Sequence, residues 1–482
     1  MPGSLSRNGH EPGTGPNVVV PACVFAAILG FVGLYVLDRA LYFSILGLWA
    51  FSPFKYPFID AEYIGEAIKC WHQGVDIYLS NPCDELGRLF DYSPLWLRMS
   101  FWPTDGAWVN PTGLCLDGLF ALSLAILPRA RQPGDYVPII LCVLSPVTFY
   151  AMERGNVDLL MFALIMLAVL CVGRDAPRRL PGYGAILLAA LLKFYPLAVM
   201  VLVLRERPRS CALVSLVSLA VLAGFIWTYD HELSLTLSNI PRPSIFLGAF
   251  GAIQLPIGSA FFTRHMFVLA GLDVATVDKW LDIIRVDLII LLVLFYTFFV
   301  KGSVHLAEHA DFRAALDRLT QRERLCLVTG AALMCGCFLT GRNIDYRSIF
   351  ILMAMPSLLT LARTPAAGLA RVFRLTCIAA VFLMWFPIPM QQLSDRFGDI
   401  TNDQSIPTSI FWLLREATWW CFIAVLGGVL IRFVADSPLW LDAARLLRKR
   451  QRPAATGCIA VSVYPKNRSN HVSTSAGESS AM

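Results

Sequence analysis

The chain has 482 residues, of which 56% are hydrophobic and only 15% are charged, whereas about 25% are charged in a typical soluble domain. Its formal net charge of +6 is modest and gives no reason to expect a nucleic-acid partner. The apolar residues come in continuous blocks of roughly 17 to 25 residues, the length that crosses about 30 Å of hydrocarbon as a helix. The sequence therefore predicts an all-α polytopic membrane protein.

In chain order, residues 1–17 are polar and rich in Gly and Pro, and we expect a disordered cytoplasmic N-terminus. A membrane domain with about 10 to 12 spans follows over residues 18–435. Residues 436–482 should be a cytoplasmic tail, disordered from about 453. The predicted spans are 18–37, 108–128, 136–151, 157–173, 210–228, 284–304, 325–341, 347–363, 375–390 and 409–434.

Arginines in the short loops orient these spans, because cytoplasmic loops carry an excess of Lys and Arg. A further apolar stretch, 182–204, contains Lys193 and Pro196 and has arginines on both sides. We expect two half-helices joined near Lys193, which would make this segment re-entrant. A single tilted span is the alternative, and it would invert the topology of everything downstream.

With a re-entrant segment, the long loops lie outside the cell. The first of them covers residues 38–107, and the turns at 153–158 and 341–347 lie on the same face. The inner loops are mostly short and basic. We therefore expect any chemistry to occur on the extracytoplasmic face of a multi-pass plasma (inner) membrane protein.

The first outer loop contains the acidic stretch "FIDAEYIGEAIKCWHQGVDIY", in which Asp60 comes soon after the first span. A carboxylate at a membrane surface is usually just solvated, but it can also serve as a general base beside an acceptor hydroxyl. Cys70 and Cys83 both lie in this loop, where an oxidising exterior would permit a disulfide. Their spacing alone does not establish the geometry of that bond.

Charged residues also stand at the start of a predicted span, in "ERGNVDLLMF" (153–162). Asn156 could simply cap the helix. Capping does not explain Arg154, because a cation is unfavourable near a helix N-terminus. An anionic ligand would offset that cost, and so would Glu153 and Asp158 as partners.

A similar pattern occurs in "TGRNIDYRSIFILMAMP", and a lysine, Lys193, lies inside an apolar stretch. An intramembrane lysine is either a functional group or a snorkelling or ion-paired structural one. Together these residues predict a cationic pocket suited to a phosphate. The sequence has no Gly-rich nucleotide loop, so a nucleotide is not the expected phosphate carrier. The second cluster consists of Arg342, Asn343, Asp345 and Arg347.

Three stretches resemble one family in their order and spacing, over about residues 18 to 390. They are "FIDAEYIGEAIKCWHQGVDIY…FDYSPLWL", "RGNVDLLMFALIMLAVL…GAILLAALLKFYPLAVMVLVLRERPR" and "GRNIDYRSIFILMAMP". They are similar to the polyprenol-phosphate-dependent glycosyltransferases of the GT-C superfamily, above all to glycosyltransferase family 87, which includes bacterial mannosyltransferases. The resemblance implies a GT-C-type helical bundle that moves a hexose from a polyprenyl phosphate to an acceptor on the outer face.

The resemblance also implies roles for individual residues. Asp60 would be the catalytic base of an inverting transfer, with Glu62 as a second candidate acid. The donor phosphate would be bound by residues of the two clusters and of "KFYP", namely Arg154, Asn156, Asp158, Lys193, Tyr195, Arg342, Asn343, Asp345 and Arg347.

The expected partners are a polyprenyl-phosphate sugar, with mannose as the family's best-known choice, and a glycolipid or glycan acceptor. We expect no cofactor and no obligatory metal. The alternatives from other classes are a transporter or flippase, or a polymerase, for lipid-linked glycans.

Overall fold

The structure, a computed structural model, describes residues 15–50, 53–175, 178–241, 246, 248–271, 273–400 and 405–451. The termini that we expected to be disordered fall mostly outside these residues. The α-helices are α1 (Val19–Leu37), α2 (Arg39–Leu48), α3 (Ile59–His72), α4 (Val109–Ser123), α5 (Tyr136–Val143), α6 (Pro146–Glu153), α7 (Asp158–Val172), α8 (Leu180–Lys193), α9 (Pro208–Thr228), α10 (Asp230–Asn239), α11 (Gln254–Leu269), α12 (Val274–Glu308), α13 (Ala310–Asp317), α14 (Gln321–Thr340), α15 (Ile351–Leu361), α16 (Ala367–Trp385), α17 (Pro387–Phe397), α18 (Ile406–Ala435) and α19 (Pro438–Gln451). The 3-10 helices are η1 (Trp96–Arg98), η2 (Gly106–Trp108), η3 (Leu124–Ile126), η4 (Pro133–Asp135), η5 (Tyr195–Arg205) and η6 (Asp345–Phe350), and the strands are β1 (Ala249–Phe250) and β2 (Asn343–Ile344).

Seven helices among the described residues are long and apolar enough to cross a membrane. A bent pair, Pro133–Val143 and Pro146–Glu153, forms an eighth candidate with an angle of 49° between its parts. Shorter apolar helices (α2, α7, α8 and η5) accompany them. The protein is therefore an all-α polytopic membrane protein, and the expected 10 to 12 spans are approached only when the shorter helices are counted. The seven are Val19–Leu37, Gly106–Ile126, Pro208–Thr228, Ile289–Glu308, Gln321–Thr340, Ala367–Trp385 and Ile406–Ala435.

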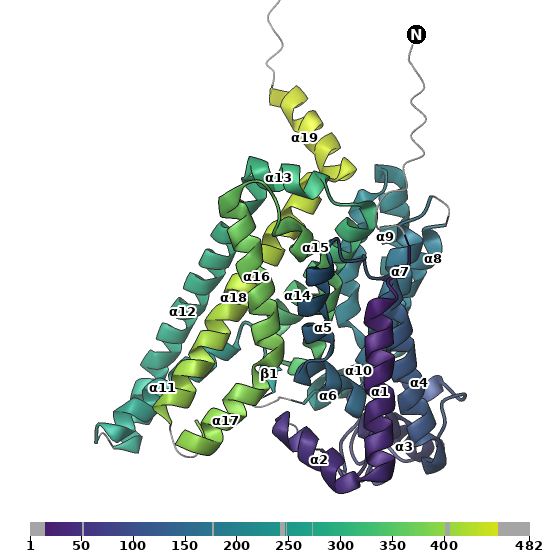
Figure 1. Cartoon of the computed structure of the whole chain (residues 1–482), viewed down its shortest axis with the longest axis vertical. Coiled ribbons are helices and arrows are strands. Elements are labelled where there is room, and N and C mark those ends of the chain that lie inside the picture. The colour runs from purple at the N-terminus through teal and green to yellow at the C-terminus, as the bar shows by residue number, and fades with distance from the viewer. Residues whose placement is uncertain are drawn as a thin grey trace, which may run out of the picture.

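The bundle has two ends of different character (Figure 1). One end, which we call the α13 end, carries α13 and α19. Basic residues of the short loops gather there, with Arg131 paired to Glu323 at 2.7 Å and Arg363 paired to Asp135. The opposite end, which we call the α3 end, carries α2, α3, α6, α10 and α17.

The first long loop is a folded part of the α3 end. It contains α2, α3 and two 3-10 helices, and its Ile64, Phe90 and Trp96 are fully buried in the same hydrophobic core as the membrane helices. The indole Nε1 of Trp96 donates a hydrogen bond to the carbonyl of Leu192 over 3.1 Å. This packing fixes the loop against the end of α8.

The apolar segment around Lys193 is broken and folds back on itself. α8 ends at Lys193, and Phe194 has a φ of 34°, so the helix cannot continue into η5. Arg179 and Glu206, at the two ends of the segment, form an ion pair at 3.1 Å. The segment is thus a helical hairpin with Lys193 at its tip, whereas its re-entrant placement in the membrane stays a prediction.

A short antiparallel sheet joins two distant loops at the α3 end. β1 pairs with β2, so that Ala249 lies opposite Ile344 and Phe250 opposite Asn343. Gly251 lies so close to the other loop that a Cβ there would approach the carbonyl oxygen of Gly341 to 2.1 Å. The pairing positions η6, which carries Arg347, beside α6 and α14.

Candidate active site

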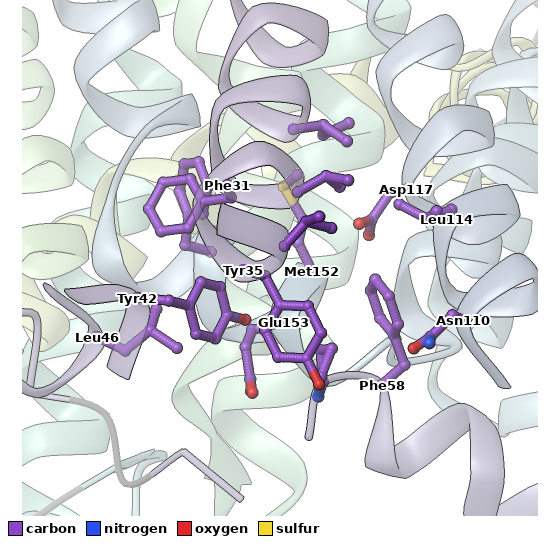
Figure 2. A pocket seen from close by; sticks show the side chains of 15 residues that line it. Phe31, Tyr35, Tyr42, Leu46, Phe58, Asn110, Leu114, Asp117, Met152 and Glu153 are labelled. Carbon is purple, nitrogen blue, oxygen red and sulfur yellow. The ribbon is translucent and has the colours of Figure 1, made fainter. Parts of the chain in front are cut away.

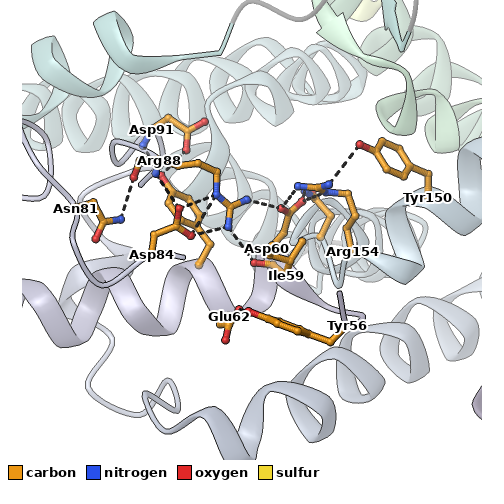
Figure 3. A network of polar contacts seen from close by, with 12 residues as sticks. Tyr56, Ile59, Asp60, Glu62, Asn81, Asp84, Arg88, Asp91, Tyr150 and Arg154 are labelled. Atoms are coloured by element: carbon orange, nitrogen blue, oxygen red, sulfur yellow. Dashed lines mark hydrogen bonds and ion pairs between the residues drawn. The ribbon is translucent and has the colours of Figure 1, made fainter. Parts of the chain in front are cut away.

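Asp60 lies at the centre of a buried network of charged side chains (Figure 3). It is the second residue of α3, and its carboxylate accepts hydrogen bonds from three side chains. Arg154 donates to both of its oxygens, from Nε over 3.0 Å and from Nη2 over 2.8 Å. Nη1 of Arg88 donates over 3.0 Å, and Nδ2 of Asn156 over 2.7 Å.

These contacts determine the ionisation of Asp60. Burial by itself would raise the pKa of the carboxyl group. The charge and hydrogen bonds of Arg154, the charge of Arg88 and the hydrogen bond from Asn156 outweigh burial and lower the pKa of Asp60 below its ordinary value. Asp60 is therefore a carboxylate at neutral pH.

Backbone contacts hold Asp60 against the turn between α6 and α7. The backbone amide of Phe58 donates to the carbonyl of Glu153 over 2.6 Å, and the backbone amide of Asp60 donates to the carbonyl of Arg154 over 2.9 Å. Gly155, in the same turn, has a φ of +57°, and a Cβ there would lie 3.1 Å from the Cβ of Phe58. Glycine is needed here both for its conformation and for the close approach.

Asn156 connects Asp60 to a second charged cluster within the site, which consists of Lys193, Asp158 and Arg347. Its Nδ2 donates to Asp60, and its Oδ1 accepts from Nζ of Lys193 over 3.2 Å. Nζ of Lys193 lies 2.7 Å from Asp158, which also accepts a hydrogen bond from the hydroxyl of Tyr195 over 2.8 Å. The "RGNVD" turn and the "KFYP" stretch, predicted to act together, thus meet in one network.

Arg347 of η6, far along the chain from Lys193, completes this second cluster. Its Nε lies 3.5 Å from Oδ2 of Asp158, and its Nη1 donates to Oδ1 of Asn343. Two cations, Lys193 and Arg347, therefore share the carboxylate of Asp158. Because burial raises the pKa of the nearby Asp91, that acid balances the two cations less well. An anion such as a phosphate is favoured beside such a cluster.

The network differs from the expected cationic pocket because most of its cations are already paired. Arg154 lies against Asp60, and Arg88 lies against both Asp60 and Asp84, the latter at 2.8 Å. Removing a buried charge from its partner is costly. Arg154 and Arg88 are thus best placed to orient Asp60, whereas Lys193 and Arg347 carry the unbalanced charge.

Some predicted residues have other partners. Glu62 accepts a hydrogen bond from Tyr56 over 2.6 Å. Asp345 accepts one from Arg415 of α18 over 2.5 Å, and so belongs to a separate buried cluster. Arg342 is half-buried in the turn that precedes Asn343.

Several residues of the site were not predicted. Arg88 and Asp91 come from the first long loop, in which no helical spacing shows which side chains turn inward. Asp91 is half-buried and accepts a hydrogen bond from the hydroxyl of Tyr63 over 3.0 Å. Burial raises the pKa of Asp91 above its ordinary value, although the hydrogen bond from Tyr63 and the charge of Lys193 act in the opposite direction.

Aromatic rings enclose the lysine of the second cluster. Nζ of Lys193 lies 4.9 Å from the ring centre of Tyr92 and 5.9 Å from that of Tyr346. Such rings stabilise an ammonium group by cation–π attraction and limit the access of water to it. Tyr92 is the residue after Asp91 in "FDYSP", and the sequence predicted no role for either residue.

Cys70 and Cys83 form a disulfide in the structure. The bond joins the end of α3, which carries Asp60, to the loop that carries Asp84 and Arg88. It therefore holds the two parts of the first long loop that contribute to the network. In the described part of the chain, no group of three or more His, Cys, Asp or Glu residues is arranged to hold a metal ion.

A comparison with models of protein families matches part of the chain. Residues 92–236 match the model of the family described as Glycosyltransferase family 87. The matched segment contains the "RGNVD" turn and the "KFYP" stretch, whereas Asp60 precedes it. No curated protein and no solved structure gave a match.

An all-helical membrane bundle whose central segment matches a transferase family defines the class of protein, a membrane glycosyltransferase. The matched family, glycosyltransferase family 87, is of GT-C type, and the match covers residues 92–236 of the 482-residue chain. This assignment favours the transferase over the transporter or flippase that stood as the alternative.

Proposed function

We propose that the protein transfers a hexose from a polyprenyl phosphate to a lipid or polysaccharide acceptor, at the extracytoplasmic face of the plasma membrane. Mannose is the first candidate for the sugar. The observation that carries this proposal is the single hydrogen-bonded path from Asp60 through Asn156 to Lys193. It connects a deprotonated carboxylate with a lysine suited to a phosphate within one buried site.

The reaction that fits this site is a single displacement. The acceptor hydroxyl gives its proton to a carboxylate, and its oxygen forms a bond to the anomeric carbon of the sugar. The bond from that carbon to the phosphate oxygen breaks, and the polyprenyl phosphate leaves with the electron pair. One displacement inverts the configuration at the anomeric carbon.

Asp60 is our candidate for the base, and Arg154 and Arg88 orient its carboxylate. Its lowered pKa keeps it deprotonated, but it also makes Asp60 a weak base. Asp91 is the competing candidate, because its raised pKa suits a base better and the hydroxyl of Tyr63 occupies only one of its oxygens. The two candidates predict different pH profiles of kcat/KM, because a base acts only when it is deprotonated.

Lys193 and Arg347 are our candidates for binding the donor phosphate. They share Asp158, and negative charge that develops on the leaving phosphate would balance their excess positive charge. The hydroxyl of Tyr195, which donates to Asp158, helps to fix the carboxylate between them.

The extracytoplasmic orientation rests on the charges of the opposite end. The short basic loops gather at the α13 end, and such loops are retained in the cytoplasm. The network lies at the α3 end, and hence outside.

The test is an assay of the purified protein in detergent, with radiolabelled polyprenyl phosphate mannose and a total lipid extract. A new labelled product supports the proposal and supplies the acceptor for identification. If mannose gives no product, polyprenyl phosphate glucose and arabinose are tried in turn. The absence of transfer from all three donors would contradict the proposal.

A further inference from the structure

We infer that a pocket beside the Asp60 network binds the acceptor, holding its lipid chain against apolar walls and bonding hydroxyl groups of its polar head. This inference rests on the proposed glycosyl transfer and names the acceptor class as an amphiphile with a hydrocarbon chain and a polyhydroxyl head. The pocket lies between α1, α2, α4 and α6, with a volume of about 190 Å³ (Figure 2). Pockets for whole drug-sized ligands measure about 300 to 1,000 Å³, so this one suits a segment of a chain.

The walls of the pocket suit a hydrocarbon chain. Phe31 of α1, Leu114 of α4 and Met152 of α6 line it. Val36 of α1 also lines it and is 74% exposed, so the pocket opens at the surface of a candidate membrane span. A lipid in the bilayer could therefore insert its chain from the side.

Two acidic side chains lie in this apolar pocket without hydrogen-bond partners for their buried oxygens. The side chains are those of Asp117, which is 4% exposed, and Glu153, which is 8% exposed. The oxygens without a partner are Oδ1 of Asp117 and Oε1 of Glu153. Figure 2 shows the carboxyl group of Asp117 directed into the pocket. A carboxyl group inside a membrane helix is costly and marks a functional site by default. A ligand that bears hydroxyl groups would provide the missing hydrogen bonds.

The donor fits this pocket poorly. No Lys or Arg lines it in the described part of the chain, and a phosphate there would face two acids. The cations suited to the phosphate, Lys193 and Arg347, come from α8 and η6 instead. A single displacement needs the acceptor and the leaving phosphate to occupy different places, so the acceptor requires a binding site of its own.

The pocket adjoins the two segments that carry Asp60 and Arg154. Phe58 and Glu153 line the pocket, and the amide of Phe58 donates to the carbonyl of Glu153 over 2.6 Å. Asp60 follows Phe58 by two residues, and Arg154 follows Glu153 directly. An acceptor whose head group bonds Glu153 is therefore held next to the turn that positions Asp60.

Photo-crosslinking of the full-length protein in nanodiscs tests this inference without requiring turnover. The probe is dodecyl mannoside with a diazirine in its alkyl chain, and cross-linked peptides are mapped by mass spectrometry. We expect labels on pocket-lining residues of α1 and α4, removed by excess dodecyl mannoside and not by polyprenyl phosphate. Labels only elsewhere, or labels removed by polyprenyl phosphate, would overturn the inference.

Variants sharpen this test. Leu114→Trp fills the pocket, and the double variant Asp117→Asn, Glu153→Gln removes the carboxylates with little change in shape. We expect Leu114→Trp to lower pocket labelling about tenfold by blocking the probe, and the double variant to lower it about tenfold by weakening the hydrogen bonds to the head group. The control is Leu122→Trp, on the same helix but outside the pocket and 60% exposed, which should label normally. Normal labelling of both pocket variants would contradict the inference.

The two proposals can fail separately. Pocket labelling without any transfer product would contradict the proposed function and leave the pocket as a glycolipid site. Transfer without pocket labelling would support the function and overturn the pocket. If Leu114→Trp does not fold, the double variant and the wild-type map still decide.

Discussion

At the scale of single residues, two neighbouring acids have opposite environments. Asp60 is bonded by two arginines and an asparagine, which lower its pKa, whereas burial raises the pKa of Asp91. Carboxyl groups whose surroundings move their pKa values apart often have different roles in catalysis. Each of the two candidate bases therefore predicts a different pH dependence of the reaction.

The pH dependence of kcat/KM should identify the base. A base acts only when deprotonated, so the rate falls as the pH drops through its pKa. If Asp60 is the base, activity should persist to below the ordinary Asp value of about 3.9, with any loss of fold monitored in parallel. An acid limb above that value, together with loss of activity in Asp91→Asn, would transfer the role to Asp91.

Lys193→Met should weaken donor binding by about tenfold or more, because it removes the charge nearest to the proposed phosphate. The single variant also leaves Asp158 buried beside one cation fewer. The matched control is therefore Lys193→Met combined with Asp158→Asn, which removes both charges. Donor affinity, measured by equilibrium binding of polyprenyl phosphate, should stay low in both. Wild-type affinity in the double variant would exclude a phosphate role for Lys193.

Sequence reasoning identified part of the site, for reasons that differ between residues. Asn156 and Lys193 were predictable because polar groups are costly in or beside apolar helices. Arg88 and Asp91 were not, because they lie in an irregular loop in which no period relates sequence to facing side chains. Asp345 was grouped with Arg347 by proximity in sequence, but it bonds Arg415, about 70 residues away along the chain.

At the scale of elements, the α6–α7 turn sets the position of Asp60. Gly155→Ala should destabilise the protein by about 1 to 2 kcal/mol, because the residue has a left-handed conformation and its Cβ would press on Phe58. Thermal unfolding in detergent measures this effect. Gly118→Ala is the control, since a Cβ there meets nothing within 4 Å and the site is helical. Equal melting temperatures for the two variants would contradict the role of the turn.

The main helices were predictable from their apolar length, and the break at Lys193 from its lysine and proline. Short helices of the α3 end, such as α2, α10 and α17, were not predicted. They lack the continuous apolar block that marks a span, and tertiary packing determines them. The pairing of β1 with β2 was not predictable either, because it joins segments about 95 residues apart in the chain.

At the scale of the whole molecule, the hairpin of α8 and η5 decides on which side each end lies. If the hairpin returns the chain to the cytoplasmic side, Ser210 at the start of α9 lies on the cytoplasmic side and Ser238 of α10 lies outside the cell. In a background of Cys115→Ser and Cys421→Ser, an impermeant thiol reagent applied to cells should label Ser238→Cys and not Ser210→Cys. Labelling of Ser210→Cys would mean that residues 182–204 form a single span.

The most direct test of the central claim compares wild type with Asp60→Asn in the radiolabelled transfer assay, with donor binding measured on the same preparations. The account predicts that Asp60→Asn lowers transfer at least about a hundredfold, the usual contribution of a general base, while polyprenyl phosphate binds with unchanged affinity. Asp84→Asn serves as a control that alters a partner of Arg88 without removing Asp60. Transfer by Asp60→Asn at the wild-type rate would contradict the account.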